Sequence, residues 1–316
     1  QTLICLAVVL AALPAHADGL DAAAGKALFD RQWIPAPSST DGSDGLGPLF
    51  NARSCATCHP RAAGARVLQR PDGMRDIAGA IVRFGKANGA TDPFYGLQLQ
   101  TDAVPGFTPE GTAQFLPRLS MHRNGPTLQQ GMHSGVRLAP SLAGRAAFDR
   151  VPNSEILKRA DPNDRDGDDI SGRANEVNGS IGRYGWKAAH ASLTDQIAHA
   201  FAIDLGLSSP KAQLPFGDCT GAQTDCRSAP TGESALFEGR EISNQMLQLV
   251  ADYLHSLPAR VSQDEHPGAA IFTKTGCAAC HVPTLKISDG GNIPAFTDLL
   301  LHDMGQDLDD GVGEPG

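Results

Sequence analysis

The most regular pattern of apolar and polar positions runs from residue 242 to residue 257. Apolar side chains recur there at intervals of three and four, which places them on one face of an amphipathic helix. Pro258 follows directly and ends the helix, because proline lacks the N–H that a continuing helix needs. The apolar face comprises Ile242, Met246, Leu249, Val250, Tyr253, Leu254 and Leu257. We expect this helix to close a domain, with a boundary near Arg260.

Two shorter stretches also predict helices. The first is "AAGKALFDRQW" (23–33), and the second lies within 266–281, where Gly268 and Phe272 share a helical face. The segment between the first helix and the next motif (34–47) is rich in Gly, Pro, Ser and Asp and therefore predicts an inserted loop.

The N-terminus carries a short apolar run that ends in Ala15-His16-Ala17, the small-x-small pattern of a signal-peptidase site. The run is too short to span a membrane. A buried N-terminal helix is the alternative interpretation. Because the sequence does not begin with Met, we expect a clipped signal peptide over residues 1–17. The mature chain then starts near Asp18 and is periplasmic.

Composition changes this picture in two ways. The chain has 316 residues with a formal net charge of −9 and no Lys/Arg run, which argues against nucleic acid as a partner. Aromatic residues make up only 5%, while 35 Gly and 22 Pro indicate long loops. A chain with so few aromatic residues needs other apolar material for its hydrophobic core, and a large buried cofactor would supply it.

Cysteine usage narrows the chemistry. Cys5 lies in the signal segment, and Cys219 and Cys226 lie close together in "DCTGAQTDC". In an oxidising compartment such a pair predicts a structural disulfide. A metal or redox role for this pair is the alternative, but no histidine adjoins it.

The other four cysteines belong to two copies of the pentapeptide CxxCH, the attachment signature of c-type haem. The two cysteines add to the vinyl groups of the porphyrin, and the histidine binds the iron as proximal ligand. A zinc site would normally pair two CxxC units, and a thioredoxin-like site needs a βαβ pattern that is absent. We therefore predict two covalent haems. Their residues are Cys55, Cys58 and His59, and Cys277, Cys280 and His281.

These elements predict a mainly α fold with long loops, arranged as two c-type cytochrome-like domains. Residues 18–260 form the first domain, with large insertions, and residues 261–316 the second. Only 35 residues follow His281, and they contain no helix that could cover a porphyrin. We expect the second domain to be incomplete at its C-terminus.

Several stretches resemble the dihaem oxidoreductase family, often labelled thiol oxidoreductases. They follow the family order across nearly all of the mature chain. Two departures stand out: Leu205 occupies a position where the family often has Met, and "LAGRAAFDRVP" (142–152) replaces a Gly-Leu-rich segment. The resemblance implies peroxidase-like chemistry and makes Trp186 a candidate electron relay between haems; a core role is its alternative. The matching stretches are 49–59, 92–111, 159–175, 182–209, 275–283 and 297–305.

The iron of each haem has a second face, and its occupant decides between electron storage and catalysis. For the second haem the candidates are Met304 and His302, which follow the motif closely; alternatively, Met304 packs on the porphyrin edge and His302 caps a turn. The sequence does not choose among the candidates for the first haem, and a loop histidine is often solvent-facing. These candidates are Met74, Met121, His122, Met132 and His133.

The segment "DPNDRDGDDISGRANE" (161–176) predicts a calcium site. Asp164, Asp166 and Asp168 alternate around Gly167, which suits a hard cation. The spacing departs from an EF-hand, and a solvated acidic turn is the alternative. Calcium between haem domains is also implied by the resemblance to dihaem peroxidases.

Three functions fit these observations. The first is a dihaem peroxidase that reduces H2O2, with one haem binding the oxidant and the other storing an electron; its distal acid/base candidates are Gln98, Gln100, Glu110 and Glu155. The second is a pure electron-transfer cytochrome, and the third an enzyme that oxidises residues of a partner protein. A small cytochrome or cupredoxin is the expected electron partner.

Overall fold

The computed structural model describes residues 17–40, 42–69, 73, 75–165, 167, 170–259 and 267–314. Most of the predicted signal segment, Met74 and the predicted boundary at Arg260 lie outside these residues. Among the described helices, none combines the length and the apolar character that a membrane span requires. The α-helices are α1 (Ala17–Asp30), α2 (Cys55–Cys58), α3 (Asn153–Leu157), α4 (Leu193–Leu205), α5 (Asn244–Ser256) and α6 (Gly268–Lys274).

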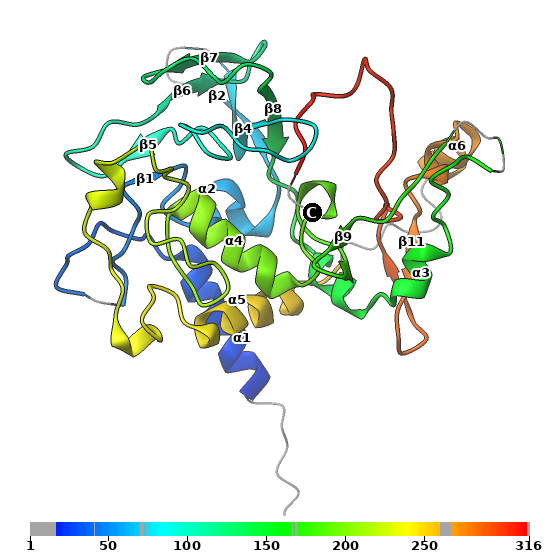
Figure 1. Cartoon of the computed structure of the whole chain (residues 1–316). Coiled ribbons are helices and arrows are strands. Elements are labelled where there is room, and N and C mark those ends of the chain that lie inside the picture. The colour runs from blue at the N-terminus through cyan, green and yellow to red at the C-terminus, as the bar shows by residue number, and fades with distance from the viewer. Residues whose placement is uncertain are drawn as a thin grey trace, which may run out of the picture.

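The strands pair into short antiparallel ladders (Figure 1). The longest joins β4 (Ala80–Gly85) to β8 (His133–Leu138), with Arg83 opposite Gly135. The remaining pairs are β1 (Leu49–Phe50) with β5 (Asp102–Ala103), β2 (Arg66–Gln69) with β3 (Arg75–Ala78), β6 (Gly111–Gln114) with β7 (Ser120–Arg123), β9 (Glu176–Val177) with β10 (Ser180–Ile181), and β11 (Thr284–Lys286) with β12 (Asn292–Pro294).

The prediction of a mainly α fold is wrong. Among the described residues, helices account for only 27% and strands for 20%. The predicted loops between the two haem motifs contain most of the strands, each only two to six residues long. A strand this short shows too little alternation to stand out in a sequence, particularly among so many glycines and prolines.

The helical pattern at 242–257 is confirmed as α5, which crosses α1 at very close range. At Gly25 of α1, a Cβ atom would lie 1.8 Å from the carbonyl oxygen of Leu249, so only glycine fits the crossing. Phe29 and Tyr253 stack edge to face beside it, with ring centroids 5.3 Å apart. This crossing anchors the main hydrophobic core, which also includes Trp33, Phe201 and Leu247.

Helix α4 packs on α5 and has well-formed ends. Ser192 caps its N-terminus by accepting a hydrogen bond from the Asp195 N–H. Gly206 ends it in the left-handed conformation, with φ 73°. In Figure 1, α4 lies between the α1–α5 pair and the strands β4, β6, β7 and β8. Those strands cover a second apolar cluster of Val82, Phe84, Tyr95 and Leu99.

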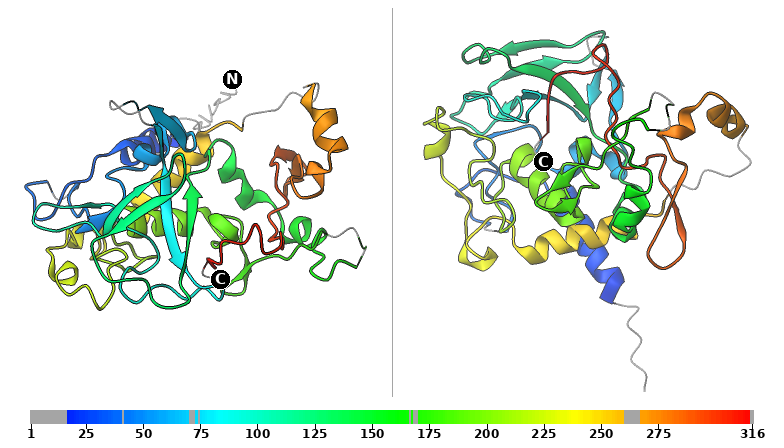
Figure 2. Two further views of the ribbon diagram at one scale, coloured as in Figure 1. Left: turned by 90° about the horizontal axis from the view of Figure 1, so that it is seen from above. Right: turned by 45° about the vertical axis from the view of Figure 1, so that its right-hand side comes forward.

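The second haem motif lies apart from these elements, with α6, β11 and α3 around it (Figure 1). The chain then returns to the β4–β8 ladder, as the two further views show (Figure 2). The N–H of Gly313 donates to the carbonyl of Lys86, 3.0 Å away. We call residues 309–314 the C-terminal strap. It connects the part of the chain that carries the second motif to the part that carries the first.

Candidate functional site

The first CxxCH motif forms a single helical turn, α2, as predicted. The N–H of His59 donates to the carbonyl of Cys55 at 2.9 Å, which brings the histidine back beside the cysteines. Ser54 precedes the turn, and its hydroxyl accepts a hydrogen bond from Gln32 Nε2 at 2.9 Å. The motif is therefore fixed to the segment that follows α1.

The imidazole of His59 is oriented by a backbone carbonyl. Its Nδ1 lies 2.9 Å from the carbonyl oxygen of Pro140. Because a carbonyl can only accept, Nδ1 carries the proton and Nε2 keeps its lone pair. Burial lowers the pKa of His59, which favours the neutral ring. A neutral imidazole with a free Nε2, held by a hydrogen bond from Nδ1, is the usual form of a metal-binding histidine.

The second motif repeats this arrangement. Cys277–Ala279 form a 3₁₀ turn, and the His281 N–H donates to the Cys277 carbonyl at 2.9 Å. Nδ1 of His281 lies 3.2 Å from the carbonyl oxygen of Phe296. The ring of Phe272, on α6, stands edge-on to the imidazole with centroids 6.4 Å apart. Each motif thus presents two thiols and one imidazole nitrogen on a helical turn.

Burial keeps the thiols of the first motif protonated. Together with a smaller contribution from the charge of Asp204, it raises the pKa of Cys55 and of Cys58 to about 12. Among the described residues, no group of three or more His, Cys, Asp or Glu side chains could hold a metal ion.

A buried polar network adjoins the first motif, and three of the acid/base candidates belong to it. Gln98 is fully buried, and its Nε2 donates to Asn51 Oδ1 at 2.6 Å and to Asp204 Oδ1 at 2.9 Å. Gln100 Nε2 donates to the carbonyl of Ile203 at 3.0 Å. The N–H of Asn51, four residues before Cys55, donates to the Asp204 carbonyl at 2.9 Å. The network therefore reaches the haem motif through the backbone.

Glu110 closes the network on its other side. Its carboxyl accepts hydrogen bonds from the Gln100 N–H and from Gln223 Nε2, both at 2.7 Å. Burial nevertheless raises the pKa of Glu110 to about 8. Gln223 lies in the loop closed by the predicted disulfide, and the structure confirms the bond between Cys219 and Cys226. The disulfide loop thus forms one wall of the network.

Glu155, the fourth acid/base candidate, lies elsewhere. Burial acts to raise its pKa, but hydrogen bonds from Lys158 and Arg159 outweigh that effect and lower the pKa to about 2. A carboxylate held in two ion pairs keeps its charge and has no proton to move. The structure therefore separates Glu155 from the other three.

The candidate ligands for the open haem faces are scattered. Met121 packs against the cluster beneath β4, while His122 and His133 are exposed. Met132 precedes β8 and is half-buried. Met304 is 61% exposed. None of these positions identifies a ligand.

His302 has partners of its own. Its Nδ1 lies 2.6 Å from the Ser171 carbonyl, and its Nε2 lies 2.8 Å from Asp298 Oδ2. Both ring nitrogens are therefore engaged. With Asp298 it lines a cavity of about 470 Å³ beside the second motif, which Ala278 and Val282 also line.

Sequence analysis missed a pair of histidines on α4 and in the loop before it. The rings of His190 and His199 lie 4.6 Å apart. Burial lowers the pKa of both, and that of His199 to about 3, helped by the charge of Arg83. The only signal was the presence of two histidines in the family-like stretch 182–209, and their nine-residue spacing fits no single element.

Several buried donors around the first motif lack a partner. They include Nε1 of Trp33 and both Nε and Nη1 of Arg83. Buried donors normally find acceptors, so these atoms are available to a bound group that bears oxygen atoms. A porphyrin has two carboxylates and a large apolar face, and these residues fit it.

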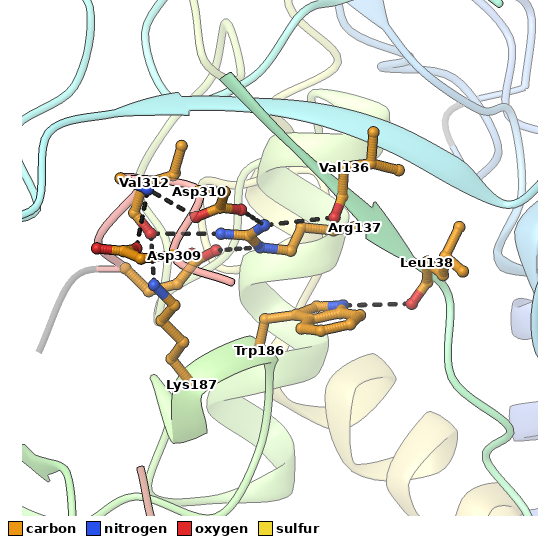
Figure 3. A network of polar contacts seen from close by, with 10 residues as sticks. Val136, Arg137, Leu138, Trp186, Lys187, Asp309, Asp310 and Val312 are labelled. Carbon is orange, nitrogen blue, oxygen red and sulfur yellow. Dashed lines mark hydrogen bonds and ion pairs between the residues drawn. The ribbon is translucent and has the colours of Figure 1, made fainter. Parts of the chain in front are cut away.

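Trp186 lies beside Leu138 and Arg137 (Figure 3). It is 48% exposed, and its Nε1 donates to the carbonyl of Leu138 at 3.2 Å. Leu138 is two residues before Pro140, which holds the ring of His59. The guanidinium of Arg137 lies 5.6 Å from the centroid of the indole ring. Trp186 therefore sits between the first motif and the segment that follows the second.

Arg137 binds the C-terminal strap to β8. Its Nε lies 3.1 Å from Glu314 Oε1, its Nη1 contacts the carboxylate of Asp310, and its Nη2 donates to the Val312 carbonyl at 3.3 Å. Lys187 Nζ donates to the same carbonyl at 2.7 Å. Figure 3 shows the guanidinium enclosed between the strap and the indole ring.

The predicted calcium loop is only partly described. Asp166 and Asp168 lie outside the described residues. Asp164 adopts a positive φ of 46°, and Asp161 nearby pairs with Arg165 at 3.1 Å. The calcium site stays a prediction.

The two motifs and their oriented histidines define a chain built to hold two haems. A family described as "Di-haem oxidoreductase, putative peroxidase" matches residues 120–314, well over half of the chain. The chain belongs to this family and is a dihaem oxidoreductase. No curated protein and no solved structure matches it.

Proposed function

We propose that this chain is a periplasmic c-type dihaem oxidoreductase that reduces hydrogen peroxide. One observation carries the proposal: two CxxCH turns, each with its histidine fixed through Nδ1 to a backbone carbonyl. In each turn, the two thiols would attach to the porphyrin vinyl groups, and Nε2 would bind the iron. The disulfide between Cys219 and Cys226 supports an oxidising compartment.

Reduction of hydrogen peroxide to two molecules of water consumes two electrons and two protons. When bound, the haems supply the redox chemistry, and a pair of them can deliver both electrons. The electrons come from an external donor, for which we propose a small cytochrome or cupredoxin. What the protein must add is proton delivery, an electron path and exclusion of water.

Glu110 suits proton delivery. Because burial raises its pKa to about 8, the carboxyl holds a proton at neutral pH, close to the operating pH where an acid works best. Gln223 and the Gln100 N–H fix its orientation. The side-chain oxygens of Gln98 and Gln100 are buried and lack donors, so they could accept hydrogen bonds from a small polar substrate.

Trp186 suits the electron path. Its indole N–H is bonded to Leu138, two residues from the Pro140 carbonyl that holds His59. Its ring also contacts Arg137, which binds the strap that follows the second motif. We assign it the relay between the two haem sites.

The proposal is tested in two steps. A pyridine haemochrome assay and the mass of the denatured chain should show two attached haems. Stopped-flow turnover with H2O2 and a reduced donor cytochrome should then be observed, together with a high-spin haem in the half-reduced protein by EPR. Two low-spin haems that do not react with cyanide or peroxide would indicate an electron-transfer cytochrome. Oxidation of a partner protein's side chains without peroxide turnover would indicate the third function.

A further inference from the structure

Arg83 carries a positive charge whose guanidinium is only partly hydrogen-bonded among the described residues. Arg83 is half-buried on β4, and its Nε and Nη1 are buried without a hydrogen-bond partner. Asp218 is close enough for the Arg83 charge to act on its pKa, but its Oδ2 accepts the N–H groups of Leu97 and Gln98, at 2.7 and 2.9 Å. No ion pair joins Arg83 to another described residue. These two atoms of the guanidinium are therefore available as hydrogen-bond donors.

Two imidazoles lie within range of the Arg83 charge. His190 and His199 have ring centroids 4.6 Å apart, and the charge of Arg83 acts on both. Both rings are neutral at pH 7, so each offers one N–H donor and one acceptor. We call Arg83, His190 and His199 the Arg83 cluster. It combines one fixed positive charge with several donors, and this is the chemistry that recognises a carboxylate.

Both elements that carry the cluster also border the first haem motif. β4 begins after Gly79, where a Cβ would lie 2.7 Å from the carbonyl oxygen of Cys58. α4 carries Asp204, whose charge acts on the thiols of Cys55 and Cys58. Gln98 joins the two elements, because its backbone bridges to Arg83 and its side chain bonds to Asp204. The same two elements, β4 and α4, therefore border both the Arg83 cluster and the first motif.

We propose that the Arg83 cluster binds a carboxylate of the haem held at the first motif, one of its two propionates. This inference rests on the proposed haem attachment. A guanidinium fork matches the two oxygens of a carboxylate and neutralises its charge, whereas a neutral molecule such as peroxide would leave the arginine uncompensated. The imidazole N–H groups complete the set of donors. The cluster would then set both the orientation and the potential of the first haem.

The test uses the mature dihaem protein and the variants Arg83→Gln and Arg83→Lys. Arg118→Gln, which removes an exposed arginine, is the charge-matched control. Redox titration followed by visible spectroscopy should show a lower midpoint potential for the first haem in Arg83→Gln, because loss of a nearby positive charge favours the oxidised iron. The second haem, identified with the Cys277→Ala variant, should keep its potential and serves as the internal control for folding.

Arg83→Lys keeps the charge but loses the fork. Its potential should stay near that of the wild type, while the propionate bending band in the resonance Raman spectrum shifts. If Arg83→Gln and Arg118→Gln give the same potentials, or if Arg83→Lys leaves the Raman band unchanged, the inference is wrong. If acetate or chloride shifts the potential of the wild type but not of Arg83→Gln, the cluster binds a free anion instead. Absence of attached haem in the wild type would instead refute the proposed function itself.

Discussion

Replacing Arg137 with methionine should release the C-terminal strap from β8. The side chains of Arg137 and Glu314 are only 5% and 6% exposed, so their ion pair is buried. Methionine has a similar length and no charge, and it leaves the Glu314 carboxylate without its partner. The Asp310 pair is a third exposed on the carboxylate side and contributes less.

The size of the effect follows from this burial. Removing one partner of a buried ion pair costs about 3–5 kcal/mol, because the remaining charge stays uncompensated. At about 1.4 kcal/mol for each factor of ten, the strap would open between roughly one hundred and several thousand times more often than in the wild type. The amides that report opening include Gly313, whose N–H donates to the Lys86 carbonyl, and Val312, whose N–H donates to Asp310.

Native-state hydrogen exchange on peptides covering 305–314 measures this opening directly. The control is Arg150→Met, which removes an ion pair with Asp289 whose two side chains are more than half exposed, and it should leave the exchange of these peptides unchanged. The double variant with Glu314→Gln should be less destabilised than the two single changes added together, because no buried charge is left alone. Additive effects, or wild-type exchange in Arg137→Met, would refute the argument.

Four further predictions concern the haem sites and the aspartate loop. Cys277→Ala should remove one equivalent in the pyridine haemochrome assay and leave the other; two intact equivalents would mean that the second motif does not hold haem. Glu110→Gln should slow peroxide turnover by about 10²–10⁴-fold, with the donor cytochrome reduced as before. Since the pKa of Glu110 is raised to about 8, the folded state keeps a proton that the unfolded chain loses near pH 4.5, so the wild type loses stability as pH rises from 4.5 to 8. In urea unfolding, the stability of Glu110→Gln should depend less on pH over that range than the stability of the wild type. An identical pH dependence would mean that Glu110 does not have the raised pKa. Treatment with EGTA should shift a haem potential if the aspartate loop (161–169) binds calcium; no shift and no bound metal by elemental analysis would retire that site.

Helices and motifs were predictable because each is encoded locally. The apolar spacing around Leu249 and Val250 indicates α5, and CxxCH indicates a helical turn with a histidine behind it, without reference to the rest of the chain. The β4–β8 ladder was missed, because six residues of mixed polarity, such as "AIVRFG" (80–85), show no clear alternation. Its pairing also joins residues about fifty positions apart.

The candidate site was predictable by residue type but not by arrangement. Gln98, Gln100 and Glu110 were identified along the chain, yet it is α4 and the disulfide loop that enclose them. The sequence placed Glu155 in the same set of candidates, but the structure pairs it with Lys158 and Arg159 and so separates it from the others. The Arg83 cluster depends on contacts between a strand and a helix more than a hundred residues apart, and no local pattern encodes such a contact.

The six cysteines after the predicted signal segment would have to reach opposite chemical fates. Cys219 and Cys226 are oxidised, and their loop carries Gln223 to Glu110. The four motif cysteines form no disulfide, and the attachment that we propose needs them reduced. A disulfide within either motif would block attachment of a porphyrin, whereas reduction of the Cys219–Cys226 bond would open the loop that carries Gln223. Production of active protein therefore depends on the order of events: thioether formation first, or a thiol-specific reductase that leaves the loop intact.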